Sequence, residues 1–245
     1  MQSDSFPKIT VFAHLYYSAS IDEFISHLTD IATYKPDFFF NLGPSCDREL
    51  QIEKIRSHFP EAYILDSPNI GKDVGGKLAL LELYGRLNLQ SDYMLFIHDK
   101  QSPQVIHGEK WKNELLEILK MNKIKEVMRI YESEPSVGII GALKHISNEY
   151  DSKTQKFNTK NDEILREYIA GFKFTANEFS FIAGNMFWVR ASIFEHFFKI
   201  NNPLKLRSGL EEGNVLDAES GTRTHSLERV FGWIALNQGF SIKGI

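Results

Sequence analysis

Short apolar, β-branched segments alternate with amphipathic segments through the first hundred residues, and this alternation restricts the possible folds most strongly. Segments with strand character are 8–15, 38–42, 62–66 and 94–98, and segments with helix character between them are 21–33, 47–58 and 76–87. In the first helical segment, apolar side chains recur at helical spacing on one face. Strands joined by helices predict an α/β fold, in which helices cover both faces of a mostly parallel central sheet.

The second half of the chain is less regular. It predicts helices over 111–132, 161–172, 192–199 and 225–238, and strands over 137–143 and 181–190, the latter with a glycine break. Residues 144–160 and 201–224 are rich in polar residues and turn formers, which favours loops. A long irregular stretch such as 201–224 is typical of a functional or mobile segment. The chain ends in a strand-like run that stops abruptly, so we expect a domain excised from a longer protein.

Charge and cysteine content exclude several classes of protein. The chain has 28 Lys and Arg against 32 Asp and Glu, a net charge of −4, which excludes a strongly basic protein that binds nucleic-acid polymers. Cys46 is the single cysteine, so an intramolecular disulfide and a zinc site of several thiolates are excluded. No signal-peptide pattern and no long apolar span are present, and we expect a cytoplasmic protein.

Because parallel sheets bind ligands at the carboxyl ends of their strands, residues that directly follow strands are the candidates for function. The first strand is followed by HLYY, which includes His14. The third is followed by SPNIGKDVGG (67–76), whose backbone amides and Lys72 suit an anion, while Asp73 suits sugar hydroxyls. The alternative for this segment is a tight turn with a helix N-cap.

The fourth strand ends in HDKQS (98–102), which places three titratable groups at the edge of the sheet. Asp99 offers oxygen ligands to a divalent metal such as Mg²⁺ or Mn²⁺. A single carboxylate, without the second acid of a D-x-D pair, provides few ligands for a metal. We therefore expect no required cofactor and no dedicated metal site. Lys100 and His98 are instead candidates to stabilise an anionic leaving group such as a diphosphate. The alternative is a solvated turn.

Two later segments add aromatic and acidic candidates. AGNMFWVR (183–190) places Phe187 and Trp188 beside Gly184, as a sugar-stacking platform or alternatively as core. The stretch 211–229 contains four carboxylates, Glu211, Glu212, Asp217 and Glu219, before His225, Glu228 and Arg229. One carboxylate could act as a general base toward a hydroxyl. The alternative is a solvated acidic loop with a helix-capping ion pair.

Together these segments resemble the rhamnan synthesis protein F family of bacterial polysaccharide glycosyltransferases. The resemblance rests on PNIGKD (68–73), FIHDKQS (96–102) followed by Trp111, AGNMFWVR (183–190) and SGTRTHSLERVF (220–231), in the family's order. It covers roughly residues 9–235. Two departures are Ser220, where the family has an acidic residue, and Gly75-Gly76, where the family often has proline.

The resemblance implies a GT-A-like nucleotide-sugar-binding fold and a Leloir glycosyltransferase, expected to be an inverting hexosyltransferase. The sugar, with L-rhamnose as a candidate, would pass from a nucleotide-diphospho-sugar to a hydroxyl of a growing O-antigen or cell-wall glycan. A lipid-linked acceptor, and peripheral contact with the inner face of the plasma membrane or with other synthase domains, would follow. We expect one domain over 1–245, with 1–105 binding the nucleotide-sugar and 106–245 binding the acceptor.

Residue by residue, the motifs and the resemblance assign three groups. The donor group is His14, Asn69, Gly71, Lys72, Asp73, His98, Asp99, Lys100 and Ser102. The acceptor group is Gly184, Met186, Phe187, Trp188, Glu228 and Arg229. The catalytic group is Asp217, the first choice of base, with Glu219 and His225. A non-catalytic glycan-binding or assembly module of a polysaccharide synthase is the alternative, motivated by Ser220. A Rossmann-like methyltransferase or nucleotide enzyme is disfavoured because HLYYSAS is not glycine-rich.

Overall fold

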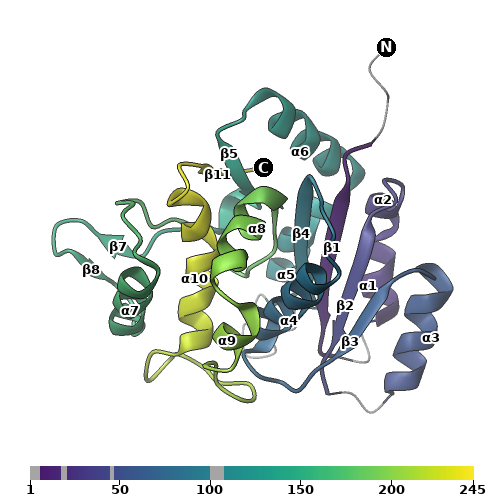
Figure 1. The fold of residues 1–245 in the computed structure, drawn as a ribbon, viewed down its shortest axis with the longest axis horizontal. Helices are drawn as coiled ribbons and strands as arrows, with labels where there is room; N and C mark the ends of the chain where they lie inside the picture. Colours follow the sequence, from purple (N-terminus) through teal and green to yellow (C-terminus); the bar gives the residue numbers. More distant parts are fainter. Residues whose placement is uncertain (1–5, 18–20, 45–46, 100–107) are drawn as a thin grey trace.

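A seven-stranded sheet lies at the centre of the computed structural model, which describes residues 6–17, 21–44, 47–99 and 108–245. The strand order is β11-β5-β10-β4-β1-β2-β3 (Figure 1). The strands are β1 (Ile9–Leu15), β2 (Asp37–Leu42), β3 (Tyr63–Asp66), β4 (Tyr93–His98), β5 (Val137–Gly141), β10 (Phe187–Arg190) and β11 (Ser241–Gly244). All neighbours pair in parallel except β10, which runs antiparallel to both β4 and β5.

Helices cover both faces of this sheet, which confirms the predicted α/β architecture. They are α1 (Ile21–His27), α2 (Thr29–Ala32), α3 (Arg48–His58), α4 (Lys72–Arg86), α5 (Gly108–Leu116), α6 (Met121–Ser133), α7 (Asp162–Phe172), α8 (Ala191–Ile200), α9 (Pro203–Arg207) and α10 (Arg223–Leu236). The 3₁₀ turn η2 (Glu117–Leu119) joins α5 to α6, and the 3₁₀ turn η3 (Leu143–His145) follows β5. One apolar cluster packs α1, α3 and α6 on one face, and another packs α4, α8 and α10 on the other.

Three segments differ from their predictions. Residues 181–190 form two strands, because left-handed backbone at Gly184 (φ 86°) and Asn185 (φ 54°) turns the chain between them. The first, β9 (Phe181–Ile182), pairs with β6 (Ile146–Ser147) in a separate two-stranded sheet. The predicted loop 144–160 also holds the pair β7 (Tyr150–Asp151) and β8 (Lys156–Phe157). The irregular segment 201–224 contains α9.

The register of the sheet determines where the site forms. His14 near the end of β1 lies opposite Asn41 of β2 on one side and His98 of β4 on the other. Polar side chains from three neighbouring strands therefore meet at one edge of the sheet.

Helix α4 begins at Lys72, four residues before the predicted start, and it packs unusually close to this edge. Gly71, with φ 73°, precedes it. A Cβ at Gly76 would lie 2.2 Å from His14 Nδ1, and one at Gly75 would lie 1.7 Å from the carbonyl oxygen of Ile70. Gly76 therefore lets α4 approach β1, and Gly75 lets the helix start lie close to the preceding Ile70. Among the described residues, no helix combines the length and apolarity that a membrane span requires.

Candidate functional site

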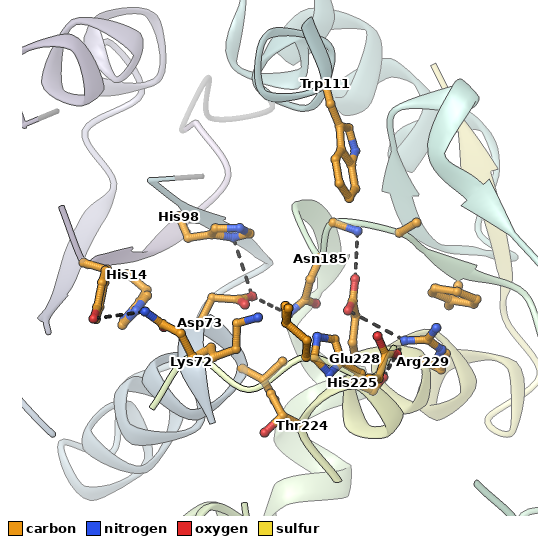
Figure 2. A pocket seen from close by; sticks show the side chains of 18 of the residues that line it. His14, Lys72, Asp73, His98, Trp111, Asn185, Thr224, His225, Glu228 and Arg229 are labelled. Atoms are coloured by element: carbon orange, nitrogen blue, oxygen red, sulfur yellow. Dashed lines mark hydrogen bonds and ion pairs between the residues drawn. The ribbon is translucent and has the colours of Figure 1, made fainter. Parts of the chain in front are cut away.

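A cavity of about 510 Å³ opens at the carboxyl ends of β1 and β4. Its walls come from the first turn of α4, the turn between β9 and β10, the segment 214–217 and the first half of α10. Figure 2 shows His14 and His98 on one side, His225, Glu228 and Arg229 on the other, and Asp73 and Asn185 between them. Trp111 of α5 extends toward the cavity from a third direction. This is the arrangement expected when ligands bind at strand ends of a parallel sheet.

A buried polar network forms the floor between α4 and β4. Asp73 Oδ2 accepts hydrogen bonds from Lys77 Nζ (3.0 Å) and Asn185 Nδ2 (2.9 Å), and lies 3.6 Å from His98 Nδ1. Burial by itself would raise the pKa of Asp73, but His98 and Lys77 beside it, and the hydrogen bonds it accepts, hold that pKa well below its ordinary value. Asp73 is therefore ionised at neutral pH.

His14 is fixed by a chain of hydrogen bonds. Ser67 Oγ donates to Asn41 Oδ1 (2.8 Å), and Asn41 Nδ2 lies 2.8 Å from His14 Nδ1. Because the amide nitrogen can only donate, Nδ1 accepts and the ring proton sits on Nε2. Burial is the main reason why the pKa of His14 is lowered to about 4. The Asp73 carboxylate works against this shift, and the positive charges of Lys77 and Arg207 increase it. The ring is thus a neutral donor at pH 7.

Asp99 ties the segment after β1 to the end of β4. Its carboxylate accepts backbone N–H bonds from Tyr16 (2.8 and 2.9 Å) and Tyr17 (2.6 Å). Among the residues that the structure describes, no cluster of three His, Cys, Asp or Glu is placed to hold a metal. These contacts assign Asp99 a positioning role.

The segment 210–217 is clamped to the start of α4. Gly71 N donates to the carbonyl of Glu211 (2.8 Å), and Asn69 Nδ2 donates to Asn214 Oδ1 (3.1 Å). Lys72 Nζ reaches the carbonyl of Val215 at 3.3 Å. Lys72 therefore lies at the junction of the two segments, on the wall of the cavity.

Asp217 and His225 lie together on the opposite wall. Asp217 Oδ2 accepts a hydrogen bond from Asn161 Nδ2 (2.9 Å). Burial by itself would raise the pKa of Asp217, but this bond and the nearby His225 and Arg229 lower it below its ordinary value. His225 Nδ1 lies 2.6 Å from Thr222 Oγ1, which already accepts from the backbone N–H of His225. Burial, mainly, lowers the pKa of His225, with Asp217 opposing it. An ionised carboxylate and a neutral imidazole thus share this wall.

Glu228 and Arg229 act mostly within the protein. Arg229 binds Glu149 through two parallel bonds of 2.9 and 2.7 Å and donates to the carbonyl of His225 at 2.7 Å. Glu228 Oε1 accepts from Gly184 N at 2.8 Å. The first pair connects α10 to the β6–β7 segment, and the second fixes the turn between β9 and β10.

The structure brings most of the predicted site residues to this one cavity. Its lining includes His14, Asn69, Lys72, Asp73, His98, Asp99, Gly184, Asp217, His225, Glu228 and Arg229. Gly71 lies just outside it as the residue that starts α4. Glu219 is exposed and does not line it. Lys100 and Ser102 lie outside the described residues.

Three predicted acceptor residues are placed elsewhere, and the expectation for them is corrected. Met186 and Trp188 are 0% exposed and Phe187 is 2% exposed. Met186 and Trp188 pack into the core on one face of the sheet, and Phe187 into the core on the other. Strand β10 lies between β4 and β5, and an apolar cluster covers each face of the sheet there. These side chains have no surface on which a sugar could stack.

Several residues that line the cavity were assigned to none of the three groups, among them Tyr16, Tyr17, Asn185, Glu149 and Thr224. Tyr16 and Tyr17 belong to HLYY, which the strand-end rule had indicated, but only His14 of that segment was given a role. Asn185 lies inside a motif that had been noted for its aromatic residues. No signal in the sequence links Glu149 to the cavity, because its partner Arg229 is 80 residues away.

The fold and the cavity define an α/β domain with a polar ligand site at the carboxyl ends of its parallel strands. The chain belongs to the rhamnan synthesis protein F family, whose pattern it matches over residues 2–240, and the predicted membership is confirmed. No curated protein matches the chain.

Two solved structures of S. aureus TarS (residues 1–349) are similar to this chain. The complex with UDP is 13% identical with a TM-score of 0.42, and the other structure is 14% identical with a TM-score of 0.38. Each match covers 94% of this chain and 65% of the TarS chain. The chain thus spans slightly less than two thirds of the TarS chains it matches.

Proposed function

We propose that this chain is a Leloir glycosyltransferase of polysaccharide synthesis, with a GT-A-like domain. Membership in the rhamnan synthesis protein F family supports the class of reaction. The observation that carries the proposal is one cavity that combines a cationic helix start, Lys72 on α4, with an ionised carboxylate, Asp217, on the opposite wall. The first suits a diphosphate, and the second suits activation of an acceptor hydroxyl.

The donor diphosphate would lie against the start of α4. Fifteen residues long, α4 directs its free backbone N–H groups and the positive end of its dipole toward this edge of the sheet. Lys72 adds a full positive charge there, and the neutral His14 adds an N–H donor. Both would stabilise the charge that develops on the leaving nucleoside diphosphate.

The acceptor would bind on the α10 side. Asp217 would take the proton of the acceptor hydroxyl while that oxygen attacks the anomeric carbon and the bond to the diphosphate breaks. Attack from the face opposite the leaving group inverts the anomeric centre. Glu228 and Arg229 would shape the acceptor side indirectly, because both are held by contacts within the protein.

The finer parts of the proposal concern the substrates. L-Rhamnose from a dTDP-linked donor, and a lipid-linked glycan at the inner face of the membrane, are proposed from the family resemblance alone. In this proposal residues 1–105 mainly hold the donor and 106–245 the acceptor, within one domain. The proposed step uses no metal, because Asp99 is a single carboxylate without the D-x-D pair of metal-dependent transferases.

A thermal-shift screen against dTDP-, UDP-, GDP- and CMP-linked sugars tests the donor, since a ligand that binds only the native state raises its melting temperature. Release of nucleoside diphosphate from the selected donor then tests the chemistry. We expect release in excess EDTA, and loss of release in Lys72→Ala. Activity that EDTA abolishes and Mn²⁺ restores would contradict the metal-free step.

The second candidate is a non-catalytic glycan-binding or assembly module. The specific observation in its favour is Ser220, which is exposed and stands where the family has an acidic residue. Glycan binding with no release of nucleoside diphosphate from any of the four donor types would support the module and overturn the transferase.

A further inference from the structure

The most deeply buried charge in the cavity floor belongs to a residue that no motif indicated. Lys77, on the second turn of α4, has a fully buried side chain (0% exposed). We propose that Lys77 is a positioning residue that fixes His98 as its Nε2–H tautomer and holds the Asp73 carboxylate beneath the ligand. Its effect on turnover rests on the proposed function, whereas its effect on His98 does not.

The contacts of Lys77 reach three elements that form the floor. Its ammonium donates to Asp73 Oδ2 on its own helix (3.0 Å), to the carbonyl oxygen of Asn185 in the β9–β10 turn, and toward His98 Nδ1 at the end of β4 (3.3 Å). An ammonium group has three protons and no lone pair, so every one of these partners must accept. A buried ammonium is costly unless it is paired in this way.

This geometry selects the tautomer of His98. A proton on Nδ1 would point at the Lys77 ammonium, only 3.3 Å away, and no lone pair is available there. The Asp73 carboxylate is farther from Nδ1, at 3.6 Å for Oδ2, and this oxygen already accepts from both Lys77 and Asn185. Nδ1 therefore accepts, and the ring carries its proton on Nε2.

Two neighbouring histidines thus carry their ring proton on Nε2. His14 lies beside His98 in the β1–β4 register, and its Nδ1 also accepts, from Asn41. The two rings thus offer Nε2–H groups at adjacent strand ends. Two N–H donors side by side suit the oxygens of a diphosphate.

Lys77 also neutralises Asp73. An ionised carboxylate in the first turn of α4 would otherwise repel the anion that the helix start attracts. A lysine four residues later on the same helix, buried below the carboxylate, cancels this charge at short range while leaving Lys72 to act on the ligand. Lys77 therefore also reduces the repulsion between Asp73 and an anionic ligand.

Histidine ring ¹⁵N NMR of the ligand-free protein tests the inference directly, with His98→Gln used to assign the His98 signals. At pH 7 we expect an unprotonated Nδ1 and a protonated Nε2 on His98. In Lys77→Met we expect the proton to move to Nδ1, which then faces the Asp73 carboxylate without the ammonium beside it. The tautomer should persist in Asp73→Asn and in Lys120→Met, a control at an exposed lysine.

Either of two results would overturn the inference: a protonated Nδ1 in the wild type, or an unchanged tautomer in a folded Lys77→Met. The wild-type measurement decides the matter even if Lys77→Met does not fold. Donor turnover gives the functional readout, and we expect kcat to fall about 100-fold in Lys77→Met, with a much smaller change in KM, because loss of one positioned donor costs this much. A wild type without turnover would overturn the proposed function and leave the NMR result to stand alone.

Discussion

Asn161 Nδ2 donates a hydrogen bond of 2.9 Å to Asp217 Oδ2, joining residues that are 56 positions apart in the sequence. The same carboxamide accepts from the backbone N–H of Thr222 at 2.8 Å, just before α10. Asn161 is fully buried, so it orients Asp217 and anchors the start of the helix that carries His225. The carboxylate is thereby held ionised on the cavity wall.

We predict that Asp217→Asn lowers glycosyl transfer by about 10²- to 10⁴-fold, the usual contribution of a positioned general base. Donor binding should persist, because the amide keeps the shape of the side chain. Transfer rates and a thermal shift with the donor measure the two effects. Loss of transfer in Glu219→Gln, with transfer retained in Asp217→Asn, would instead identify Glu219 as the base.

The buried neutral His14 makes the native state sensitive to acid. Its pKa falls from 6.5 to about 4 on folding, so the unfolded chain binds a proton first as the pH drops below 6.5. Stability is therefore lost as the pH falls from 6.5 toward 4, by about 2 kcal/mol at pH 5. Urea denaturation at pH 7 and pH 5 should show this loss reduced by about that amount in His14→Gln. An equal loss in both proteins would contradict the prediction.

Gly76 and Gly85 lie on the same helix and form a matched pair. We predict that Gly76→Ala destabilises the fold by about 1–3 kcal/mol or more, because its Cβ would lie 2.2 Å from His14 Nδ1 and 2.9 Å from Asn41 Nδ2. Gly85→Ala, with no atom within 4 Å, should stabilise by up to about 1 kcal/mol. Urea denaturation measures both, and a tolerated Gly76→Ala would show that α4 can move away from β1.

Phe187 tests the corrected assignment of the aromatic motif. Phe187→Ala should destabilise the protein by about 3–5 kcal/mol, the usual cost of deleting a buried aromatic ring. The affinity of the folded fraction for an acceptor glycan should not change, because the ring does not reach the cavity. A variant of normal stability with weakened glycan binding would restore the sugar-stacking hypothesis.

Local patterns were sufficient for much of the fold. The apolar runs that became β1, β2 and β4 and the amphipathic segments between them indicated a mostly parallel sheet. The motif residues near strand ends, such as His14, Asp73 and His98, line one cavity, because parallel strand ends gather at one edge. The glycine break in 181–190 was visible, but its consequence, two strands in two different sheets, depends on the backbone conformation of Gly184 and Asn185.

The sequence by itself determined the family, the class of fold and which polar residues follow strands, since these depend on residue types at short spacing. Only the tertiary structure decided which residues face the cavity. Phe187 and Trp188 are as aromatic as Tyr16 and Tyr17, yet β10 lies inside the sheet while the tyrosines follow an open strand end. Lys77 is four residues from Asp73 in the sequence, and its burial comes from β4 and the β9–β10 turn packing against it. Burial is a property of contacts between distant segments, and spacing along the chain does not encode those contacts.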